Sequence, residues 1–323
     1  MPKVKILCQA SFNHGMGHLI RQIHIAKELQ KHDIKISFCI PEFSAAATIL
    51  KENNFSYSMV DKFDSSSQIK IDKTDWVMLD IQDTTLSLIQ SLRKRSEKII
   101  SFEDQGEGRN HVDILIDCNL NISDAKNITS KTKTLFDLDY SVLAPEFEKF
   151  HLEKRKFPDQ IQSLLITFGG TDPHNITLEL AKQIPNHFKT TLIAGPGFQN
   201  LKELRELKKS HFSIQENIQN MASVLASHDA VFCSGGVTLH EAMCVGTPAF
   251  VISQVAHQEV KAKAAEKTGA AINLGQASSW STNRLDEIFK IDEQTLQGMS
   301  VAGKQCIDGK GLKRVVEAIL SIC

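Results

Sequence analysis

One segment near the N-terminus reads VKILCQASFNHGMGHLIRQIHIAKELQK, residues 4–31. An apolar run of strand length comes first, a loop with two glycines follows, and apolar residues then recur at helical spacing. Parallel strands need a crossover of this kind, because the chain must return to the same edge of the sheet before the next strand begins. The segment therefore predicts a strand, a glycine loop and a helix, which together form the first unit of an α/β fold.

The same alternation continues along the chain. In the first half a helical stretch is expected at 44–52, and further strand-like runs lie at 35–40, 76–81, 99–102 and 114–116. In the second half the runs lie at 163–168, 190–194, 211–215, 230–233 and 248–252. Short apolar runs of this type suit parallel strands that are buried on both faces. The pattern predicts two doubly wound parallel-sheet domains in tandem.

A polar, charged connector separates the two halves, between Pro145 and Pro158. The chain has 323 residues and a mass of 36.0 kDa, about twice the usual size of a single domain. We therefore expect a Rossmann-like N-terminal domain at 1–150 and a Rossmann-like C-terminal domain at 151–323. Ligands of open α/β sheets bind at the carboxyl ends of the strands, so the loops that follow the strands are the candidate sites.

Charge and composition restrict the possible partners. Lysine and arginine total 37 and aspartate and glutamate 38, a net charge of -1 that creates no general attraction to nucleic acid or to anionic membranes. No apolar run reaches the roughly 18 residues of a membrane span, and polar residues interrupt the N-terminal run before it resembles a signal peptide. Seven scattered cysteines without C-x-x-C spacing favour free thiols. We expect a cytoplasmic monomer with no nucleic-acid partner, no inserted membrane segment and no metal.

The first candidate loop contains Gly15 and Gly17. Glycines let backbone N–H groups approach a ligand closely, and the helix N-terminus behind them favours anions. A dinucleotide-binding loop would place a third glycine at position 20, where the chain has Ile20. Glu42, near the end of the second strand-like run, could still act as the ribose-binding acid of such a site, so this alternative stays open.

His18 begins the expected helix, and Arg21 lies one turn further along it. The positive end of a helix dipole disfavours imidazolium, so a histidine at this place tends to stay neutral and available as a base near pH 7. A helix-capping or surface role suits the same position equally well. The motif alone leaves the two interpretations balanced.

A glycine pair follows the first strand-like run of the second half. Gly169 and Gly170 would permit close approach of a phosphate group ahead of a helix that begins near Ile176. The candidates to cap that helix are Thr171, Asp172 and Asn175. An ordinary strand-to-helix turn is the alternative interpretation, above all for Asp172.

A second glycine pair lies near position 235, again between a strand-like run and a helix. The residues expected to hold a diphosphate, through hydroxyl groups and unpaired N–H groups of the first helical turn, are Ser234, Gly235, Gly236, Val237 and Thr238. No lysine follows the glycines, which separates this loop from the phosphate loop of ATPases and argues against ATP hydrolysis.

Three further side chains are candidates for sugar contacts. Glu241 lies one helical turn after Thr238, where a carboxylate could accept hydrogen bonds from two ribose hydroxyls. His257 and Gln258 follow the run at 248–252 and could hydrogen-bond a sugar or a phosphate. A solvated helix residue and an exposed loop are the respective alternatives.

Taken together and in this order, the motifs resemble those of the UDP-sugar hydrolases of the pseudaminic acid pathway and of related spore-coat polysaccharide proteins. The matching motifs are GMGH at 15–18 with Arg21, FGGTDP at 168–173, SGG at 234–236 through Glu241, GTP at 246–248, and DGKG at 308–311 with Arg314. The C-terminal half is also similar to the UDP-GlcNAc transferase of peptidoglycan synthesis. This resemblance implies a GT-B fold, in which two Rossmann-like domains face a cleft.

The resemblance also implies a UDP-linked sugar as the substrate, namely UDP-2,4-diacetamido-2,4,6-trideoxy-β-L-altropyranose. The second domain would hold uracil near Asn220 and Met221, ribose at Glu241, and the diphosphate at 234–238 and Gly170. In this family a histidine at the position of His18 activates a water that attacks the anomeric carbon as UDP leaves. The reaction proceeds with inversion and needs no metal or cofactor.

One difference keeps a second activity open. These hydrolases carry an Asn-Gln pair where this chain has His257 and Gln258, whereas the peptidoglycan transferase has a histidine and a glutamine in that region. A GT-B glycosyltransferase that passes a sugar from UDP to a hydroxyl acceptor is therefore the alternative. Transferases that use lipid carriers usually expose an apolar or basic patch on the first domain, and the sequence contains no strong one. A binding module without catalysis is a third possibility, which the presence of His18 disfavours weakly.

Overall fold

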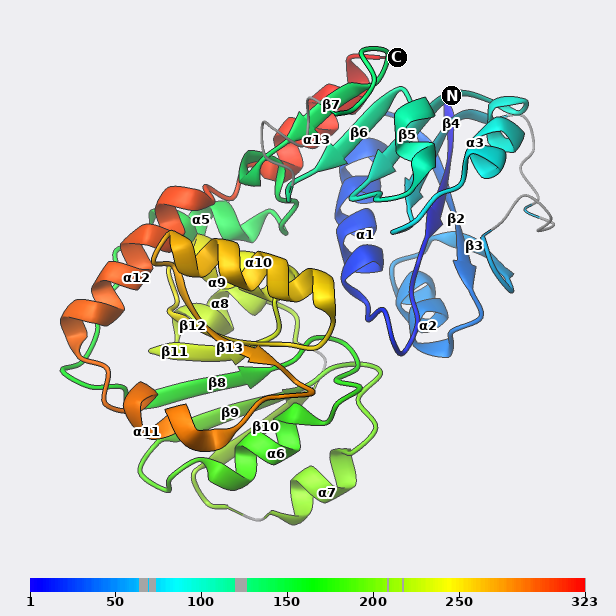
Figure 1. Ribbon diagram of the computed structural model, residues 1–323. Helices are drawn as coiled ribbons and strands as arrows, with labels where there is room; N and C mark the ends of the chain where they lie inside the picture. Colours follow the sequence, from blue (N-terminus) through cyan, green and yellow to red (C-terminus); the bar gives the residue numbers. More distant parts are fainter. Residues whose placement is uncertain (64–68, 70–73, 120–126, 208, 217, 323) are drawn as a thin grey trace. The chain divides into compact units, whose positions relative to one another are not determined.

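Each half of the chain folds around its own parallel sheet in the computed structural model, which describes residues 1–63, 69, 74–119, 127–207, 209–216 and 218–322 (Figure 1). Unit 1 consists of Met1–Ala144 and Lys310–Cys323, and unit 2 consists of Pro145–Gly309. Both units have the predicted α/β architecture. The fold class predicted from the sequence is therefore confirmed.

Unit 1 contains a seven-stranded sheet in the order β3-β2-β1-β4-β5-β6-β7, and all of its neighbouring strands are parallel. The strands are β1 (Lys3–Cys8), β2 (Lys35–Pro41), β3 (Ser56–Val60), β4 (Thr74–Asp80), β5 (Ser96–Phe102), β6 (Ile114–Asp117) and β7 (Lys133–Phe136). The chain builds the sheet outward from β1 in one direction and then from β4 in the other. This order is the doubly wound arrangement, and its switch point lies between β1 and β4.

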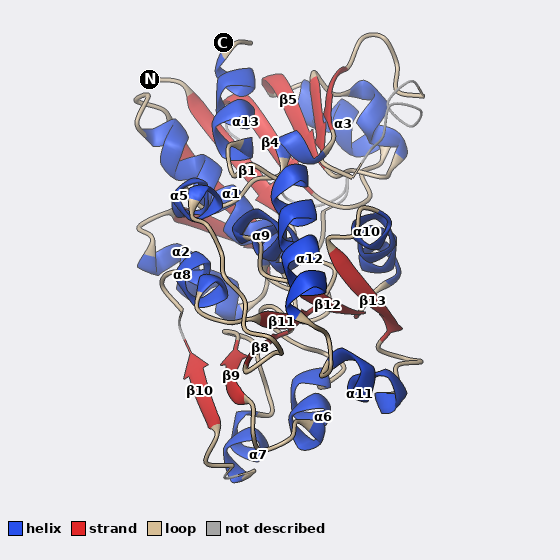
Figure 2. Cartoon of the chain, turned by 90° about the vertical axis from the view of Figure 1, so that its left-hand side faces the viewer, coloured by secondary structure: helices blue, strands red, loops and turns tan. Residues whose placement is uncertain are grey.

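Helices cover both faces of this sheet. They are α1 (Gly17–Gln30), α2 (Ser44–Glu52), α3 (Leu86–Arg93) and α13 (Gly311–Leu320), with short 3-10 turns at Glu107–His111 and Leu138–Tyr140. Successive residues of β1 enter different cores: Ile6 packs in the cluster that includes residues of α1, α2 and α13, and Leu7 packs in the cluster that includes α3. Figure 2 shows α13 beside α1, in agreement with their contacts. The strand is thus buried on both faces, as its apolar sequence predicts.

Unit 2 contains a six-stranded parallel sheet in the order β10-β9-β8-β11-β12-β13. The strands are β8 (Ser163–Thr167), β9 (Lys189–Ala194), β10 (Phe212–Glu216), β11 (Ala230–Cys233), β12 (Ala249–Ser253) and β13 (Ala271–Gln276). The helices are α5 (Glu146–Leu152), α6 (Ile176–Gln183), α7 (Leu201–Glu206), α8 (Met221–Ala226), α9 (Val237–Val245), α10 (Ala256–Lys267), α11 (Leu285–Ile288) and α12 (Glu293–Cys306), with a 3-10 turn at Thr282–Arg284. The strand order repeats that of unit 1, and the switch point lies between β8 and β11.

The observed division differs from the predicted boundary in two places. Unit 2 begins at Pro145, ahead of α5, because Phe147 is buried and α5 packs on α8 and α9. The chain then returns to unit 1 at Lys310, because α13 buries Leu312 and Val315 in the unit 1 core. This segment, which we predicted as part of the second domain, therefore belongs to the core of unit 1.

The two switch points determine which loops are brought together. At the carboxyl ends of β1 and β4, the loop that enters α1 meets the residues that end β4. At the carboxyl ends of β8 and β11, the two glycine pairs of unit 2 occupy the corresponding position. Because the loops that follow the two parallel strands at a switch point lead away to opposite sides, a crevice forms between them. The candidate residues of both units are therefore found where an open α/β sheet binds its ligands.

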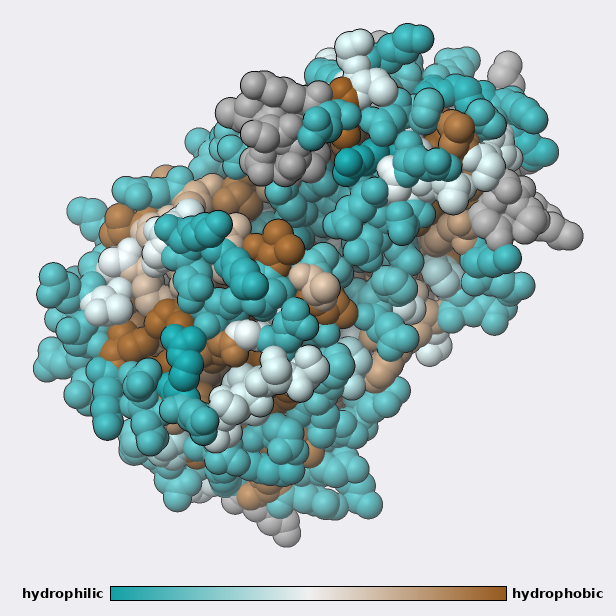
Figure 3. Space-filling model, in the orientation of Figure 1, coloured by the Kyte–Doolittle hydropathy of each residue, from teal (hydrophilic) through white to brown (hydrophobic). Residues whose placement is uncertain are grey.

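The surface is predominantly hydrophilic on the face drawn in Figure 3. The large apolar side chains that are exposed in the described part of the chain are Met1, Met59, Leu152, Val260 and Val301. They come from different elements of the two units. No helix among the described residues is both long enough and apolar enough to cross a membrane.

Candidate active site

The loop between β1 and α1 is a tight glycine turn. Gly15 has φ +75°, a left-handed conformation that favours glycine, and its N–H donates to the carbonyl of Ser11 at 2.9 Å. The helix then begins at Gly17, without a side-chain cap on its first N–H groups. This turn places His18 in the first turn of α1, at the carboxyl end of the sheet.

His18 pairs with a buried carboxylate from the neighbouring strand. Its Nδ1 lies 2.6 Å from Oδ1 of Asp80, the last residue of β4. The parallel register of β1 and β4 sets Asp80 opposite Cys8, at the carboxyl end of the sheet, where its carboxylate contacts the first turn of α1. The Asp80 side chain has no solvent exposure, whereas His18 is 16% exposed. The pair thus consists of a buried carboxylate and an imidazole that solvent can reach.

Asp80 accepts hydrogen bonds on both of its oxygens. Arg21 donates from Nη2 to Oδ1 at 2.7 Å and from Nε to Oδ2 at 2.9 Å, and Gln22 donates from Nε2 to Oδ2 at 2.8 Å. Burial raises the pKa of Asp80, but the charges of Arg21 and His18 and their hydrogen bonds outweigh it, and the pKa lies below its ordinary value. Asp80 is therefore an ionised hydrogen-bond acceptor near neutral pH.

The Asp80 carboxylate fixes the tautomer of His18. An ionised carboxylate only accepts hydrogen bonds, so Nδ1 of His18 carries the proton that is donated to Asp80. The other ring nitrogen, Nε2, then presents a lone pair, and among the described residues it has no hydrogen-bond partner. An oriented imidazole with an accessible acceptor nitrogen is the arrangement of a general base.

Arg21 is the centre of a wider ion-pair cluster. Its Nη1 donates to Oε1 of Glu103 at 2.5 Å, and Glu103 directly follows β5. Burial lowers the pKa of Arg21, but Asp80 and Glu103 together raise it well above the ordinary value. His14, in the same glycine loop, is held separately by Ser11 and Gln9.

Neither Asp80 nor Glu103 was predicted as a site residue from the sequence. Both are acidic residues at the carboxyl ends of strands that follow β1 in the sheet order. That position is a usable signal, because the sheet order brings neighbouring strand ends to one place. The neighbouring strands had been predicted, but their last residues were not considered as partners of His18.

The two glycines after β11 differ in their surroundings. A Cβ on Gly235 would lie 2.3 Å from the carbonyl oxygen of Gln258, so glycine is required there for the first turn of α10 to pack. Gly236 is more open, since a Cβ there would meet only Nε2 of Gln258 and Oγ of Ser234, each at 3.7 Å. Gly236 is also the N-cap of α9, and no side chain caps the helix. The first N–H groups of α9 therefore remain available to an anion.

Glu241 lies one turn into α9, next to Thr238. The Thr238 hydroxyl hydrogen-bonds the Glu241 carboxyl, and the Glu146 carboxylate on α5 acts on it from the neighbouring helix. Burial is the main cause that raises the pKa of Glu241 to about 7, Glu146 adds to it, and the Thr238 bond opposes it. Unlike a solvated helix residue, Glu241 thus carries an unfavourable charge at neutral pH.

The glycine pair after β8 leads into a helix that is already capped. The carboxylate of Asp172 accepts from the N–H groups of Ile176 at 3.0 Å and Thr177 at 2.8 Å. Of the three capping candidates, Asp172 is the one whose side chain caps α6. Gly169 has φ +83° and open space at its Cβ position. Gly195 packs against Gly170, with its Cβ position 2.6 Å from the Gly170 Cα.

The remaining candidates lie on loops and helix starts of unit 2. Asn220 is the N-cap of α8 and accepts from the N–H of Ser223 at 2.8 Å, and Met221 is the first residue of that helix. Gln258 accepts from the N–H of Gln254 at 2.9 Å through Oε1, which orients its amide. The Nε2 donor of Gln258 therefore faces Gly236. His257 is partly buried in the first turn of α10.

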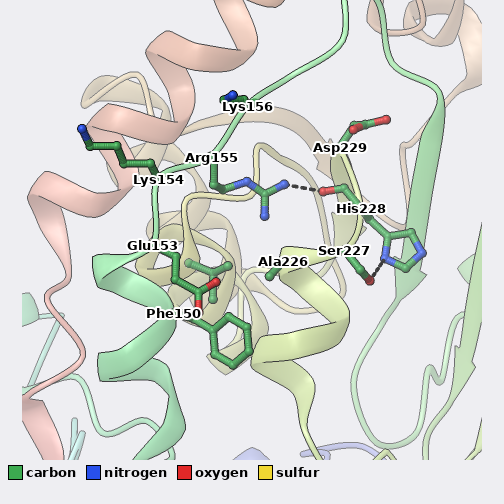
Figure 4. Close-up of a pocket in the computed structure, with 10 residues that line it drawn as sticks. Phe150, Glu153, Lys154, Arg155, Lys156, Ala226, Ser227, His228 and Asp229 are labelled. Atoms are coloured by element: carbon green, nitrogen blue, oxygen red, sulfur yellow. Dashed lines mark hydrogen bonds between the residues drawn. The ribbon is translucent and has the colours of Figure 1, made fainter.

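A cavity of about 300 Å³ lies elsewhere in unit 2 (Figure 4). It is lined by parts of 150–156 and 226–229, next to Asp229 at the amino end of β11. The Arg155 guanidinium reaches from the connector to the carbonyls of Leu225 and His228 and to the Thr247 hydroxyl. No predicted site residue lines this cavity, and it lies at the opposite end of the strands from the glycine loops. Arg155 thus joins structural elements of unit 2.

Comparisons with known proteins agree with this architecture. Residues 164–307 match the glycosyltransferase family 28 C-terminal domain. The spore coat polysaccharide biosynthesis protein SpsG of Bacillus subtilis is 26% identical over 97% of this chain and 96% of its own. The UDP-2,4-diacetamido-2,4,6-trideoxy-beta-L-altropyranose hydrolase of Campylobacter jejuni is 24% identical over 83% of this chain and 97% of its own.

The protein MJ1062 of Methanocaldococcus jannaschii is 29% identical over 78% of this chain, which spans 56% of the length of that relative. Among solved structures, MurG of Acinetobacter baumannii superimposes with a TM-score of 0.65 at 17% identity over 99% of this chain and all of that one. The spinosyn rhamnosyltransferase SpnG in complex with thymidine diphosphate gives 0.62 at 13% identity over the whole of both chains. The fold is therefore GT-B, as the sequence predicts.

Proposed function

We propose that this chain, a GT-B protein similar to SpsG and to the Campylobacter hydrolase, acts on a UDP-linked sugar and hydrolyses it to UDP and the free sugar. The observation that carries the proposal is the pair formed by His18 and Asp80, 2.6 Å apart. The buried carboxylate holds Nδ1 of His18 and leaves Nε2 as an acceptor near solvent. A base of this form suits the activation of water.

In the proposed reaction Nε2 of His18 takes a proton from a water molecule. The water oxygen forms a bond to the anomeric carbon, and the bond from that carbon to the diphosphate oxygen breaks, with UDP leaving as the anion. The proton stays on Nε2 of His18 until solvent removes it, while the Nδ1–H group on the other side of the ring still donates to the Asp80 carboxylate. Asp80 thus stabilises the positive charge that develops on the imidazole in the transition state.

The glycine loop before α9 is the proposed site for the leaving diphosphate. The open N–H groups at Gly236 and in the first turn of α9 lie next to the buried hydroxyls of Ser234 and Thr238. Hydrogen-bond donors and the helix dipole stabilise the negative charge that develops on the diphosphate as the bond breaks. Glu241 is proposed to accept from the ribose hydroxyls, and the backbone near Asn220 to contact uracil.

We propose a UDP-linked amino-deoxy sugar as the substrate, with the diacetamido-trideoxy-altrose derivative as the first compound to test. The similarity to a hydrolase named for that compound, over 83% of this chain, supports the choice. The Gln258 amide donor beside Gly236 is proposed to contact the sugar or the diphosphate.

Sugar transfer to a hydroxyl acceptor is the second candidate function. The match of residues 164–307 to a glycosyltransferase domain favours it, because the nucleotide site would serve either reaction. The pair His257 and Gln258 also follows the transferase pattern in place of the Asn-Gln of the hydrolases. In a transferase the base would act on an acceptor hydroxyl in place of water.

A single assay separates these candidates. The purified protein is incubated with a panel of UDP-sugars in EDTA without an acceptor, and UDP and free sugar are followed by ³¹P and ¹H NMR. We expect release of both products, which His18→Ala abolishes while UDP binding remains. His14→Ala is the matched control, because His14 lies in the same loop but pairs with Ser11 and Gln9. Turnover that begins only when an acceptor is added would indicate the transferase, and absence of nucleotide-sugar binding would refute both.

A further inference from the structure

The buried ion pairs of unit 1 extend beyond the base and its partner. Arg21 binds both oxygens of Asp80 through Nε and Nη2, and it binds Glu103 through Nη1. One guanidinium therefore bridges two carboxylates. The side chains are shielded from solvent, with exposed fractions of 7% for Arg21, 0% for Asp80 and 15% for Glu103. Charges in such a place interact more strongly than they do in water.

Among the described residues, the side chains of Arg21, Asp80 and Glu103 together carry one excess negative charge while His18 is neutral. Arg21 supplies one positive charge, whereas Asp80 and Glu103 supply one negative charge each. A proton on His18 would bring the cluster to neutrality. The net charge of the cluster is therefore zero in the state in which His18 has taken a proton from water. Without Glu103, the charges of Arg21 and Asp80 would cancel each other, and no negative charge would remain to balance the imidazolium of His18.

Other titratable groups lie around the cluster. Burial raises the pKa of the Cys8 thiol well above its ordinary value. Burial and the neighbouring His18 lower the pKa of His14. Cys118 donates its thiol hydrogen to Oε1 of Glu103 at 3.1 Å. Among the described residues, the titratable groups that contact the cluster or act on it through their charge are Cys8, His14, His18, Arg21, Asp80, Glu103 and Cys118; they come from β1, the α1 loop, α1, β4 and the ends of β5 and β6.

The backbone at Glu103 is held in an unfavourable conformation. Its φ of +48° lies in the left-handed region, which side chains other than glycine rarely adopt. The N–H of Glu103 donates to the carbonyl of Ile116 at 2.8 Å, and the carboxylate is held by Arg21 and Cys118. Residues in such conformations often occur at functional sites, where the surrounding structure compensates for the strain. A glycine would fit this position without strain, so the side chain itself is the feature to explain.

We propose that Glu103 is a positioning residue for the hydrolysis proposed above, on which this inference rests. Glu103 holds Arg21 against Asp80 and supplies the negative charge that balances the proton taken up by His18. Its action on the substrate is indirect, through Arg21, Asp80 and His18. Loss of the charge should therefore weaken the base while leaving the nucleotide site in unit 2 intact.

The variant Glu103→Gln keeps an oxygen for Arg21 and removes the charge. We expect kcat to fall about tenfold with little change in KM, and the acidic limb of the kcat/KM profile to move to lower pH. The imidazole ¹⁵N signals of His18 should likewise titrate at lower pH than in the wild type. Glu97→Gln is the matched control, because Glu97 is an exposed glutamate on the same strand, β5. It should leave both measurements unchanged.

The variant Glu103→Gly guards against loss of folding, because glycine accepts φ +48° without strain. We expect a folded protein whose kcat falls at least as far as that of Glu103→Gln. Wild-type kcat in the glycine variant, or an unchanged His18 titration in the glutamine variant, would overturn the proposal. If the titration moves but the wild-type protein hydrolyses no UDP-sugar, the charge coupling stands and the proposed function fails. The two hypotheses therefore fail in different measurements.

Discussion

The carbonyl oxygen of Gln258 lies 2.3 Å from the position that a Cβ on Gly235 would occupy. This backbone oxygen leaves no room for a methyl group. The loop after β11 and the first turn of α10 therefore depend on a glycine for their packing, in addition to any ligand that Gly236 accepts. The same two segments carry several of the proposed nucleotide contacts.

Gly235→Ala should destabilise unit 2 by about 1–3 kcal/mol, because either the Gln258 backbone or the start of α9 must move. Nucleotide binding should weaken at the same time. Gly298→Ala is the control, since Gly298 lies within α12 with open space around its Cβ position and alanine is the better helix former. Urea unfolding measures both effects. A Gly235→Ala protein as stable as the wild type would contradict this packing argument.

Asp80→Asn should reduce the rate of hydrolysis about 100-fold or more. The amide has one acceptor oxygen and an NH2 group in place of the two acceptor oxygens of the carboxylate. It therefore does not hold the tautomer of His18 that leaves Nε2 free to act as a base. Asp83→Asn is the control, because Asp83 is exposed in the loop after the same strand. Single-turnover kinetics report the chemical step, and UDP titration should give unchanged affinity. A variant that folds and retains the wild-type rate would remove Asp80 from the mechanism.

Thermal unfolding at several pH values should reveal the charge on Glu241. Its pKa is raised from an ordinary 4.5 to about 7, so the folded state retains a proton that the unfolded state releases. The stability from this proton is fully present below about pH 4.5 and is lost as the pH rises to about 7. Glu241→Gln should therefore be more stable than the wild type at pH 8, by about 2 kcal/mol, and should show little advantage at pH 4.5.

The same variant tests the proposed role of Glu241 in binding. Glu241→Gln should bind UDP more weakly even though it is more stable, which separates a ribose contact from a structural role. Glu203→Gln, at an exposed position of α7, is the control for both measurements. Equal stability of wild type and Glu241→Gln across the pH range would show that the carboxyl is not destabilising.

Leu312→Ala should destabilise unit 1 by about 2–5 kcal/mol, because Leu312 of α13 is buried in the core that contains β1 and α1. Hydrogen exchange should show the loss of protection in β1 and β4, while β8 and β11 of unit 2 keep theirs. Lys313→Ala, on the exposed side of α13, is the control. Loss of protection in unit 2 alone would show that the helix belongs with the second sheet.

Most of the sheet could be predicted, because central strands bury both faces and read as continuous apolar runs. The strands β3, β7 and β13 were missed for the same reason. They lie at the edges of the sheets, and their residues are mostly exposed or partly buried. A sequence such as SYSMV or AINLGQ does not contain the apolar run that marks a central strand. Edge strands are therefore predicted less well from apolar runs alone.

The part of the candidate site that could be predicted from the sequence lies within a single loop and helix start. Gly15, Gly17 and His18 stand together in the sequence, and the structure places them at a turn and a helix start. Asp80 is 62 residues from His18, and their pairing depends on the order of β1 and β4 in the sheet. No local pattern records that order. The unit to which α13 belongs was missed for a similar reason, since its apolar face fits either sheet until the tertiary contacts are known.

The return of α13 to unit 1 has a consequence for biosynthesis. A chain that emerges from the ribosome can complete unit 2 as soon as Gly309 is free, because all of that unit is then available. Unit 1 must wait for residues 311–320, and until they emerge Val315 and Leu312 leave an apolar surface of β1 and α1 uncovered. Nascent chains of this protein therefore depend on a helix that is made after unit 2 to protect a sheet that is made before it, and a chain stalled between the two would be prone to aggregation.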